Sequence, residues 1–163
     1  MAHVTIEQFE FTSVDRTTAI QVRVWVSDAI AHGTQPRAAI QLIHGMGEHI
    51  ARYDHFATYL ANLGFLVFGH DAIGHGKSAS QEQGYGILPL KDPVTYLVDD
   101  THKLRRIMQD ALAQRFDAPI PYLMFGHSFG SLVLRCYLPK YGEGLSGAIV
   151  CGTTMPNKLL SKA

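Results

Sequence analysis

Short apolar runs that alternate with segments of helical periodicity constrain the fold of this chain more than any other feature. The apolar runs occupy residues 38–43, 65–68, 122–125 and 148–151. Apolar residues at helical spacing mark residues 53–63, the stretch from Asp92-Pro93 to about Phe116, and residues 129–138, where we expect Pro139 to end the helix. Strands that alternate with helices in this way predict a mostly parallel sheet with helices on both faces.

The N-terminal part has a different period. Residues 4–11 alternate between apolar and polar positions with one interruption at Gln8, and residues 19–26 alternate cleanly, with Ile20, Val22, Val24 and Val26 on one face. This period of two predicts an antiparallel pair of strands joined by a turn near residues 13–16. We interpret residues 28–37 as a loop. The expected architecture is a single α/β domain over residues 1–163 that begins with this pair.

Composition excludes several classes of protein. The 163 residues are enough for one domain, and 47% of them are hydrophobic, which allows a sizeable core. Fourteen basic residues balance fourteen acidic ones, so the bulk charge does not favour nucleic acid as a partner. No apolar run approaches the roughly 18 residues of a membrane span, and no secretory signal is recognisable. We therefore expect a cytoplasmic protein whose two cysteines, Cys136 and Cys151, are reduced and buried.

The sequence Gly126-His127-Ser128-Phe129-Gly130 follows the third apolar run and opens a helix. A sharp strand-to-helix turn of this G-x-S-x-G type lifts a serine hydroxyl above the sheet, while the small glycines let the chain pass closely. The helix N-terminus supplies unpaired N–H groups that stabilise negative charge. We predict that Ser128 is a nucleophile; the alternative is an ordinary serine at a helix N-cap.

A second glycine-rich turn, His44-Gly45-Met46-Gly47, ends the first apolar run. The carboxyl ends of parallel strands meet at one edge of a sheet, so this turn is expected beside the serine. There the N–H of Met46 and the N–H of Phe129 form an oxyanion hole. The alternative is a tight turn without a ligand.

A third cluster extends from Asp71 to Ser78. Asp71 and His75 resemble partners of a catalytic triad, but they precede the serine in the chain, whereas an α/β-hydrolase has the order Ser, acid, His. We therefore interpret them as supports of a structural loop. The histidines and the aspartate of the glycine-rich loops match no zinc signature, so no metal site is predicted; these are His44, His49, His70, Asp71 and His75.

Together these three motifs resemble the monoacylglycerol lipase and lysophospholipase branch of the α/β-hydrolases, also described as serine aminopeptidase-like. The resemblance extends from about Val4 to the end of the chain. It implies that Ser128 is the nucleophile, that Met46 and Phe129 donate to the oxyanion, and that small or lipid esters are hydrolysed without a cofactor. His44, Gly45, Asp71 and His75 then belong to the supporting loops.

A serine nucleophile needs a base, and no histidine or aspartate follows Ser128 in this chain. Members of the family are longer and carry a cap, further strands, an acid and a histidine after this point. The chain is interpreted as a truncated piece, as one part completed by a second chain or by self-association, or as a non-catalytic binding module. A fourth interpretation is a small hydrolase that uses His44 or His75 as base. Serine aminopeptidase activity and transient contact with a membrane surface remain open.

Overall fold

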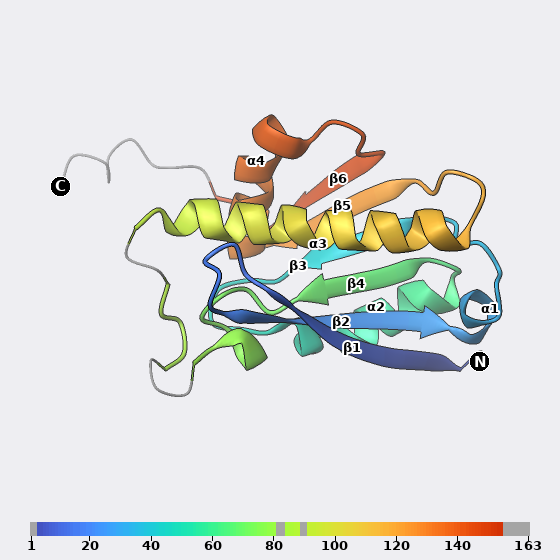
Figure 1. Ribbon diagram of the computed structural model, residues 1–163, viewed down its shortest axis with the longest axis horizontal. Helices are drawn as coiled ribbons and strands as arrows, with labels where there is room; N and C mark the ends of the chain where they lie inside the picture. Colours follow the sequence, from blue (N-terminus) through green and yellow to red (C-terminus); the bar gives the residue numbers. More distant parts are fainter. Residues whose placement is uncertain (1–2, 81–83, 89–90, 155–163) are drawn as a thin grey trace.

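A computed structural model describes residues 3–80, 84–88 and 91–154. Six strands form one sheet with the order β1-β2-β4-β3-β5-β6 (Figure 1). The strands are β1 (Val4–Thr12), β2 (Ala19–Ser27), β3 (Ala39–Ile43), β4 (Leu66–His70), β5 (Tyr122–His127) and β6 (Gly147–Cys151). β1 pairs with β2, and β2 with β4, in antiparallel register, while β4, β3, β5 and β6 run parallel. The predicted antiparallel pair and parallel sheet are therefore confirmed.

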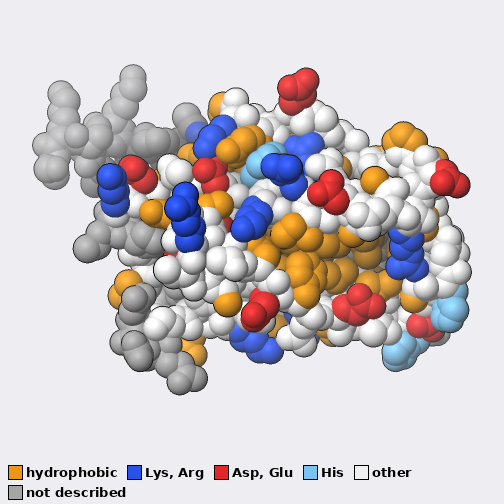
Figure 2. Space-filling model, viewed as in Figure 1, with side chains coloured by type: hydrophobic (Ala, Val, Ile, Leu, Met, Phe, Trp, Pro, Cys, Tyr) orange, Lys and Arg blue, Asp and Glu red, His pale blue; other side chains and the backbone are white. Residues whose placement is uncertain are grey.

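Helices cover both faces of the sheet. The longer helices are α2 (Asp54–Asn62), α3 (Pro93–Arg115) and α4 (Phe129–Tyr141), and the short ones are α1 (Asp28–Ala31), η1 (Ile50–Tyr53) and η2 (Gly76–Ser78). α3 and α4 pack on one face and α2 on the other (Figure 1). Charged side chains of both signs lie along α3 on its solvent side (Figure 2).

The alternation of β2 distributes its side chains between two cores. Ile20, Val22, Val24 and Val26 point toward α3 and α4, and Trp25 points toward α2, where it is fully buried. A period of two places alternate residues on opposite faces, so one strand contributes to both cores. This strand links the N-terminal pair to the rest of the domain.

Two local expectations were wrong. Pro139 does not end α4, which continues to Tyr141. A proline in the last turn removes only one backbone hydrogen bond, and Gly142 still donates to the carbonyl of Leu138 at 2.9 Å. The predicted loop at residues 28–37 contains the one-turn helix α1. Asp92, which precedes α3, has a left-handed backbone (φ 50°) and makes no side-chain cap.

The cysteines also differ from expectation, because Cys136 and Cys151 are free but exposed. Cys136 lies on the outer side of α4, and Cys151 ends β6 at the edge of the sheet. Thiol burial depends on which elements cover a position, and periodicity does not reveal this. In the described part of the chain, no helix is long and apolar enough to cross a membrane.

Candidate active site

Ser128 lies between β5 and α4 with a backbone conformation that L-residues rarely adopt, φ 50° and ψ −118°. Its N–H donates to the carbonyl of Cys151 at 2.9 Å, and its own carbonyl accepts from the N–H of Ser131, also at 2.9 Å. An ordinary N-cap serine has an extended backbone and bonds to the helix through its hydroxyl. Ser128 has neither property, and its side chain is exposed.

The two glycines of the motif allow α4 to approach the sheet closely. A Cβ on Gly130 would overlap the carbonyl oxygens of Ile43 and His44 at the end of β3. A Cβ on Gly126 would lie 2.8 Å from the carbonyl carbon of Gly130. Any side chain at these positions would push the N-terminus of α4 away from β3 and β5. The glycines therefore hold Ser128 above the carboxyl ends of these strands.

The Gly45-Met46 turn lies beside Ser128, as the topology predicts. A Cβ on Gly45 would be 3.4 Å from the Cβ of Ser128. Within the described residues, neither the N–H of Met46 nor that of Phe129 has a hydrogen-bond acceptor. Two unused backbone donors therefore flank the serine, one from each of the turns named by the sequence.

Glu48 holds this turn in shape. Its Oε1 accepts from the N–H of Gly45 at 2.5 Å and from the Tyr53 hydroxyl at 2.8 Å, and it lies 3.7 Å from Nδ1 of His127. Its Oε2 lies 3.1 Å from Nε of Arg52. Burial raises the pKa of Glu48, but the hydrogen bonds from Gly45 and Tyr53, together with the charge of Arg52, outweigh burial and keep this pKa below its usual value.

The bond to Glu48 has a consequence for the oxyanion hole. The N–H of Gly45 is committed to Glu48 and is therefore not available to an oxyanion, whereas the next N–H in the turn, that of Met46, has no acceptor among the described residues. The sequence motifs described above did not identify Glu48 as part of this turn. Its spacing of three residues from Gly45 is typical of an acid that closes a turn on itself, and this signal was readable.

His44 joins the first motif to the third. Its Nε2 accepts from the N–H of Ala72 at 2.9 Å, which places the proton on Nδ1, and Nδ1 donates to the carbonyl of Gly45 at 2.8 Å. Burial lowers the pKa of His44 more than the bond to Gly45 raises it. A neutral histidine with both nitrogens engaged braces the turn.

Asp71 and His75 are not paired with each other. Asp71 accepts from the N–H of Ile50 at 2.7 Å and from the N–H of Lys77 at 2.8 Å, so it ties the loop after β4 to η1. Nδ1 of His75 lies 3.0 Å from the carbonyl of Ile73, and its ring stacks on Phe129 at a centroid distance of 6.4 Å. Among the described residues, no group of three or more His, Cys, Asp or Glu is arranged to hold a metal ion.

Comparison with protein families matches residues 34–161, more than half of the chain, to the family described as serine aminopeptidase, S33. The monoglyceride lipase of Mus musculus is 32% identical over 113 residues, which cover 68% of this chain and 34% of the mouse protein. The monoacylglycerol lipase of Mycolicibacterium smegmatis is 31% identical over 130 residues, which cover 79% of this chain and 40% of the relative. The chain thus spans less than half the length of these relatives.

Solved structures show the same relationship. A thermostable carboxyl esterase from Bacillus coagulans superposes with a TM-score of 0.83 at 33% identity, covering 99% of this chain and 48% of the esterase. A monoglyceride lipase from Saccharomyces cerevisiae, at 21% identity and a TM-score of 0.68, shares the fold. The fold is that of the α/β-hydrolases, with its N-terminal antiparallel strands and its parallel strands in place. On its sequence and its architecture, the chain belongs to the serine aminopeptidase S33 family of α/β-hydrolases.

Proposed function

We propose that the whole protein hydrolyses carboxylic esters of the monoacylglycerol or lysophospholipid type through an acyl-enzyme on Ser128. The observation that carries this proposal is the exposed serine with φ 50°, flanked by two unbonded N–H groups. Relatives named monoglyceride lipase and a solved carboxyl esterase support the choice of an ester over other acyl compounds.

In this mechanism the Ser128 hydroxyl oxygen bonds to the ester carbonyl carbon and gives its proton to a base. The N–H groups of Met46 and Phe129 stabilise the negative oxygen that develops, each worth about 3 kcal/mol in the transition state. The C–O bond to the alcohol then breaks, and the alcohol leaves with the proton. Water attacks the acyl-enzyme by the same route and releases the carboxylic acid. No cofactor takes part.

The base is proposed to be a histidine, oriented by an acid, outside these 163 residues. No histidine follows Ser128 in the chain, and the two upstream candidates are poorly suited. His44 uses both nitrogens in hydrogen bonds, and His75 is only 2% exposed with Nδ1 beside the Ile73 carbonyl. We therefore propose that residues 1–163 are the N-terminal portion of a single α/β-hydrolase domain, inactive by themselves.

We also propose a location in the cytoplasm. There the enzyme would reach lipid esters by transient contact with a membrane surface or as dispersed substrate. The N-terminal portion is completed by further sequence, by a second polypeptide or by self-association. A serine aminopeptidase activity and a non-catalytic binding role are the competing functions, and the experiment below separates them.

The test is fluorophosphonate labelling of the protein expressed with the coding sequence that flanks these residues in its gene. Three forms are compared, the natural protein, Ser128→Ala and Ser146→Ala, because Ser146 is an exposed serine remote from the motif. We expect the natural protein and Ser146→Ala to label and Ser128→Ala not to label. Labelling of Ser128→Ala would exclude this nucleophile, and no labelling of any form would favour a binding module.

Substrate class is decided by turnover of the same natural protein. We expect hydrolysis of 1-oleoylglycerol and of p-nitrophenyl butyrate, with aminoacyl p-nitroanilides left intact; the reverse preference would make it an aminopeptidase. The 163-residue chain alone should fall at least about 1,000-fold below the longer protein, because loss of triad groups leaves only residual catalysis. Ordinary turnover by the short chain, abolished in Ser128→Ala, would mean that an upstream histidine is the base.

A further inference from the structure

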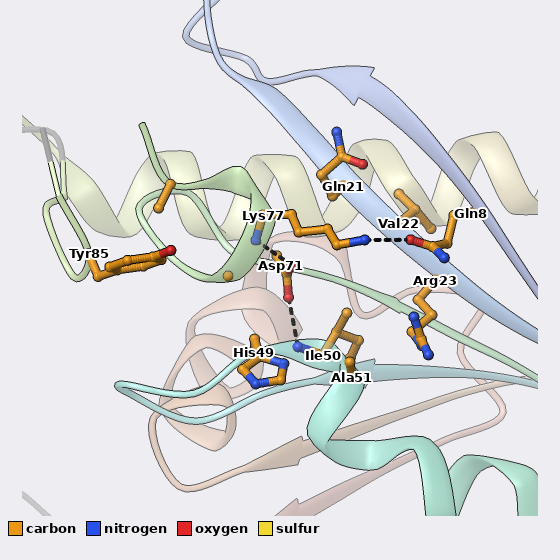
Figure 3. Close-up of a pocket in the computed structure, with 12 residues that line it drawn as sticks. Gln8, Gln21, Val22, Arg23, His49, Ile50, Ala51, Asp71, Lys77 and Tyr85 are labelled. Carbon is orange, nitrogen blue, oxygen red and sulfur yellow. Dashed lines mark hydrogen bonds between the residues drawn. The ribbon is translucent and has the colours of Figure 1, made fainter. Parts of the chain in front are cut away.

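A cleft of about 620 Å³ opens at the β2 side of the sheet, and Ser128 does not line it. β2 contributes Val22 and Arg23, the start of η1 contributes Ile50 and Ala51, and the loop after β4 contributes Lys77 (Figure 3). The volume lies within the range of small-molecule sites, about 300–1,000 Å³. β6 forms the opposite edge of the sheet, so the cleft is remote from that edge.

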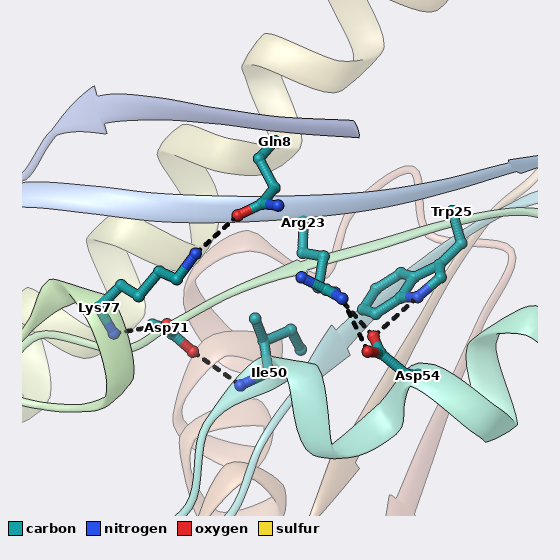
Figure 4. Close-up of polar contacts among 7 residues, drawn as sticks. All are labelled: Gln8, Arg23, Trp25, Ile50, Asp54, Asp71 and Lys77. Carbon is teal, nitrogen blue, oxygen red and sulfur yellow. Dashed lines mark hydrogen bonds and ion pairs between the residues drawn. The ribbon is translucent and has the colours of Figure 1, made fainter. Parts of the chain in front are cut away.

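Two cationic side chains keep unused donors at this cleft. Nζ of Lys77 donates to Oε1 of Gln8 at 2.9 Å, which uses one of its three protons. Arg23 donates to Asp54 through Nε and Nη2, both at 2.7 Å. In the described part of the chain its Nη1 has no partner, and Figure 4 shows this nitrogen on the side of the guanidinium toward Lys77.

The carboxylates near these donors already accept hydrogen bonds, and Glu10, on the same face of β1 as Gln8, accepts from Nε2 of Gln21 at 2.6 Å. Asp71, only 4% exposed, accepts from the backbone N–H groups of Ile50 and Lys77. Asp54 accepts from Arg23 and, at 3.0 Å, from the indole N–H of Trp25 (Figure 4). None of these carboxylates pairs with the Lys77 ammonium, whose hydrogen bond goes to a neutral amide. A positive charge at the cleft is therefore left without an anionic partner among these groups.

The rest of the lining is suited to hydrocarbon. Ile50, Ala51 and Ala79 provide apolar surface, and the ring of Tyr85 stands at the rim (Figure 3). Contact with such walls is favourable for an alkyl or aromatic body because apolar surface leaves water. The cleft thus combines cationic donors with an apolar surface.

We propose that this cleft binds an organic anion with an apolar body, a carboxylate or phosphate monoester of alkyl type. The anionic oxygens accept from Nζ of Lys77 and Nη1 of Arg23 in charge-assisted hydrogen bonds. The body lies against Ile50, Ala51 and Ala79. This site is separate from Ser128 and does not depend on the proposed hydrolysis.

The single tryptophan of the chain reports on the site. Trp25 is fully buried, shares Asp54 with Arg23, and has the guanidinium carbon of Arg23 5.8 Å from its ring centre. We expect octanoate and hexyl phosphate to change its fluorescence saturably. Octanol, octylammonium and inorganic phosphate should bind at least tenfold more weakly, because each lacks the anionic group or the apolar body.

Matched lysine variants locate the binding. Lys77→Met is expected to weaken octanoate tenfold, which corresponds to about 1.4 kcal/mol. Lys140→Met, on α4, removes a lysine that also has one hydrogen-bonded partner, Asp99, and should bind octanoate as the natural chain does. Ser128→Ala should bind equally well, and circular dichroism verifies that each variant is folded.

Several results would overturn the proposal. These are the absence of a saturable response to either anion, equal binding of octanol or inorganic phosphate, and an unchanged affinity in Lys77→Met. Loss of binding in folded Ser128→Ala would place the ligand at the candidate active site instead.

Discussion

At the scale of single residues, Ser128 shows most clearly how the sequence positions chemistry. Its φ of 50° and ψ of −118° fall in a sparsely populated region, which costs about 1–3 kcal/mol for a residue with a Cβ. The hydrogen bonds of its N–H and carbonyl groups hold this conformation. This conformation exposes the Ser128 hydroxyl between β5 and α4, and the free-energy cost of the unusual backbone is the consequence.

This strain predicts an unusual order of stability. Ser128→Gly should be more stable than Ser128→Ala by about 1–3 kcal/mol, because glycine adopts this backbone without steric cost while alanine keeps the Cβ. Urea unfolding of both variants measures the difference. At Ser146, whose φ is not positive, glycine should be no more stable than alanine. An equal or lower stability of Ser128→Gly would show that the turn is not strained.

Histidine burial gives a second residue-scale prediction. Burial, with a smaller contribution from the neighbouring His44, lowers the pKa of His70 to about 3. The unfolded chain therefore binds a proton at this site that the folded chain excludes, once the pH falls below about 6.5. The stability due to neutral His70 is complete above about pH 6.5 and is lost progressively as the pH falls toward 3.

The prediction is a weaker acid sensitivity in His70→Leu. The free energy of unfolding of the natural chain should fall between about pH 7 and pH 4.5, and His70→Leu should reduce that fall by about 1–3 kcal/mol. The exposed His55 is the control position, and His55→Leu should behave as the natural chain. Equal pH dependence in His70→Leu and the natural chain would contradict the burial argument.

At the scale of elements, the contact between α4 and β3 is decided by one glycine. A Cβ on Gly130 would overlap the carbonyl oxygens of Ile43 and His44, which are backbone atoms at the end of β3. We predict that Gly130→Ala destabilises the fold by about 1–3 kcal/mol or more, through overpacking. Gly147→Ala is the control, because its Cβ would meet only the end of the Leu123 side chain at 3.1 Å.

Thermal or urea unfolding compares the two glycine variants. Gly130→Ala should unfold well before Gly147→Ala. Similar stabilities would mean that α4 tolerates a shift away from the sheet, and the close approach would then not be needed to hold Ser128. The same contact explains why the motif has glycine on both sides of the serine.

At the scale of the whole molecule, the two edges of the sheet differ. β1 forms one edge, and most of its exposed side chains are polar, including Thr5, Glu7 and Glu10, although Ile6 is 37% exposed. β6 forms the other, and on it Ile149 is 55% exposed and Val150 37% exposed. An apolar edge strand with free backbone groups is a template for pairing with another chain.

We predict that the 163-residue polypeptide self-associates through β6. Its mass by light scattering should rise with concentration, and Ile149→Lys should shift it toward the monomer. Val94→Lys removes an apolar side chain of similar exposure, 52%, on α3 and should leave association unchanged. A natural chain that stays monomeric at all concentrations would contradict this prediction.

The sequence by itself determined the six strands, the three longer helices, the sheet class and the position of the serine motif. Three local properties can be identified without a structure. They are the periods of two and 3.6 residues, the glycines at Gly126 and Gly130, and the chirality of the chain. They predicted that the turns bearing Met46 and Phe129 meet at one edge of the sheet, and the structure places them beside Ser128.

Only the tertiary structure decided which side chains complete these turns. The bond from the Ala72 N–H to His44 joins residues 28 positions apart, and that from Arg23 to Asp54 joins residues 31 apart. Such contacts depend on the register and order of strands, which long-range packing sets. Exposure of Cys151 and the cleft beside Lys77 likewise follow from which elements cover a position. Local sequence patterns do not reveal whether such a residue is covered by another element, because the covering element comes from a part of the chain that is distant in sequence.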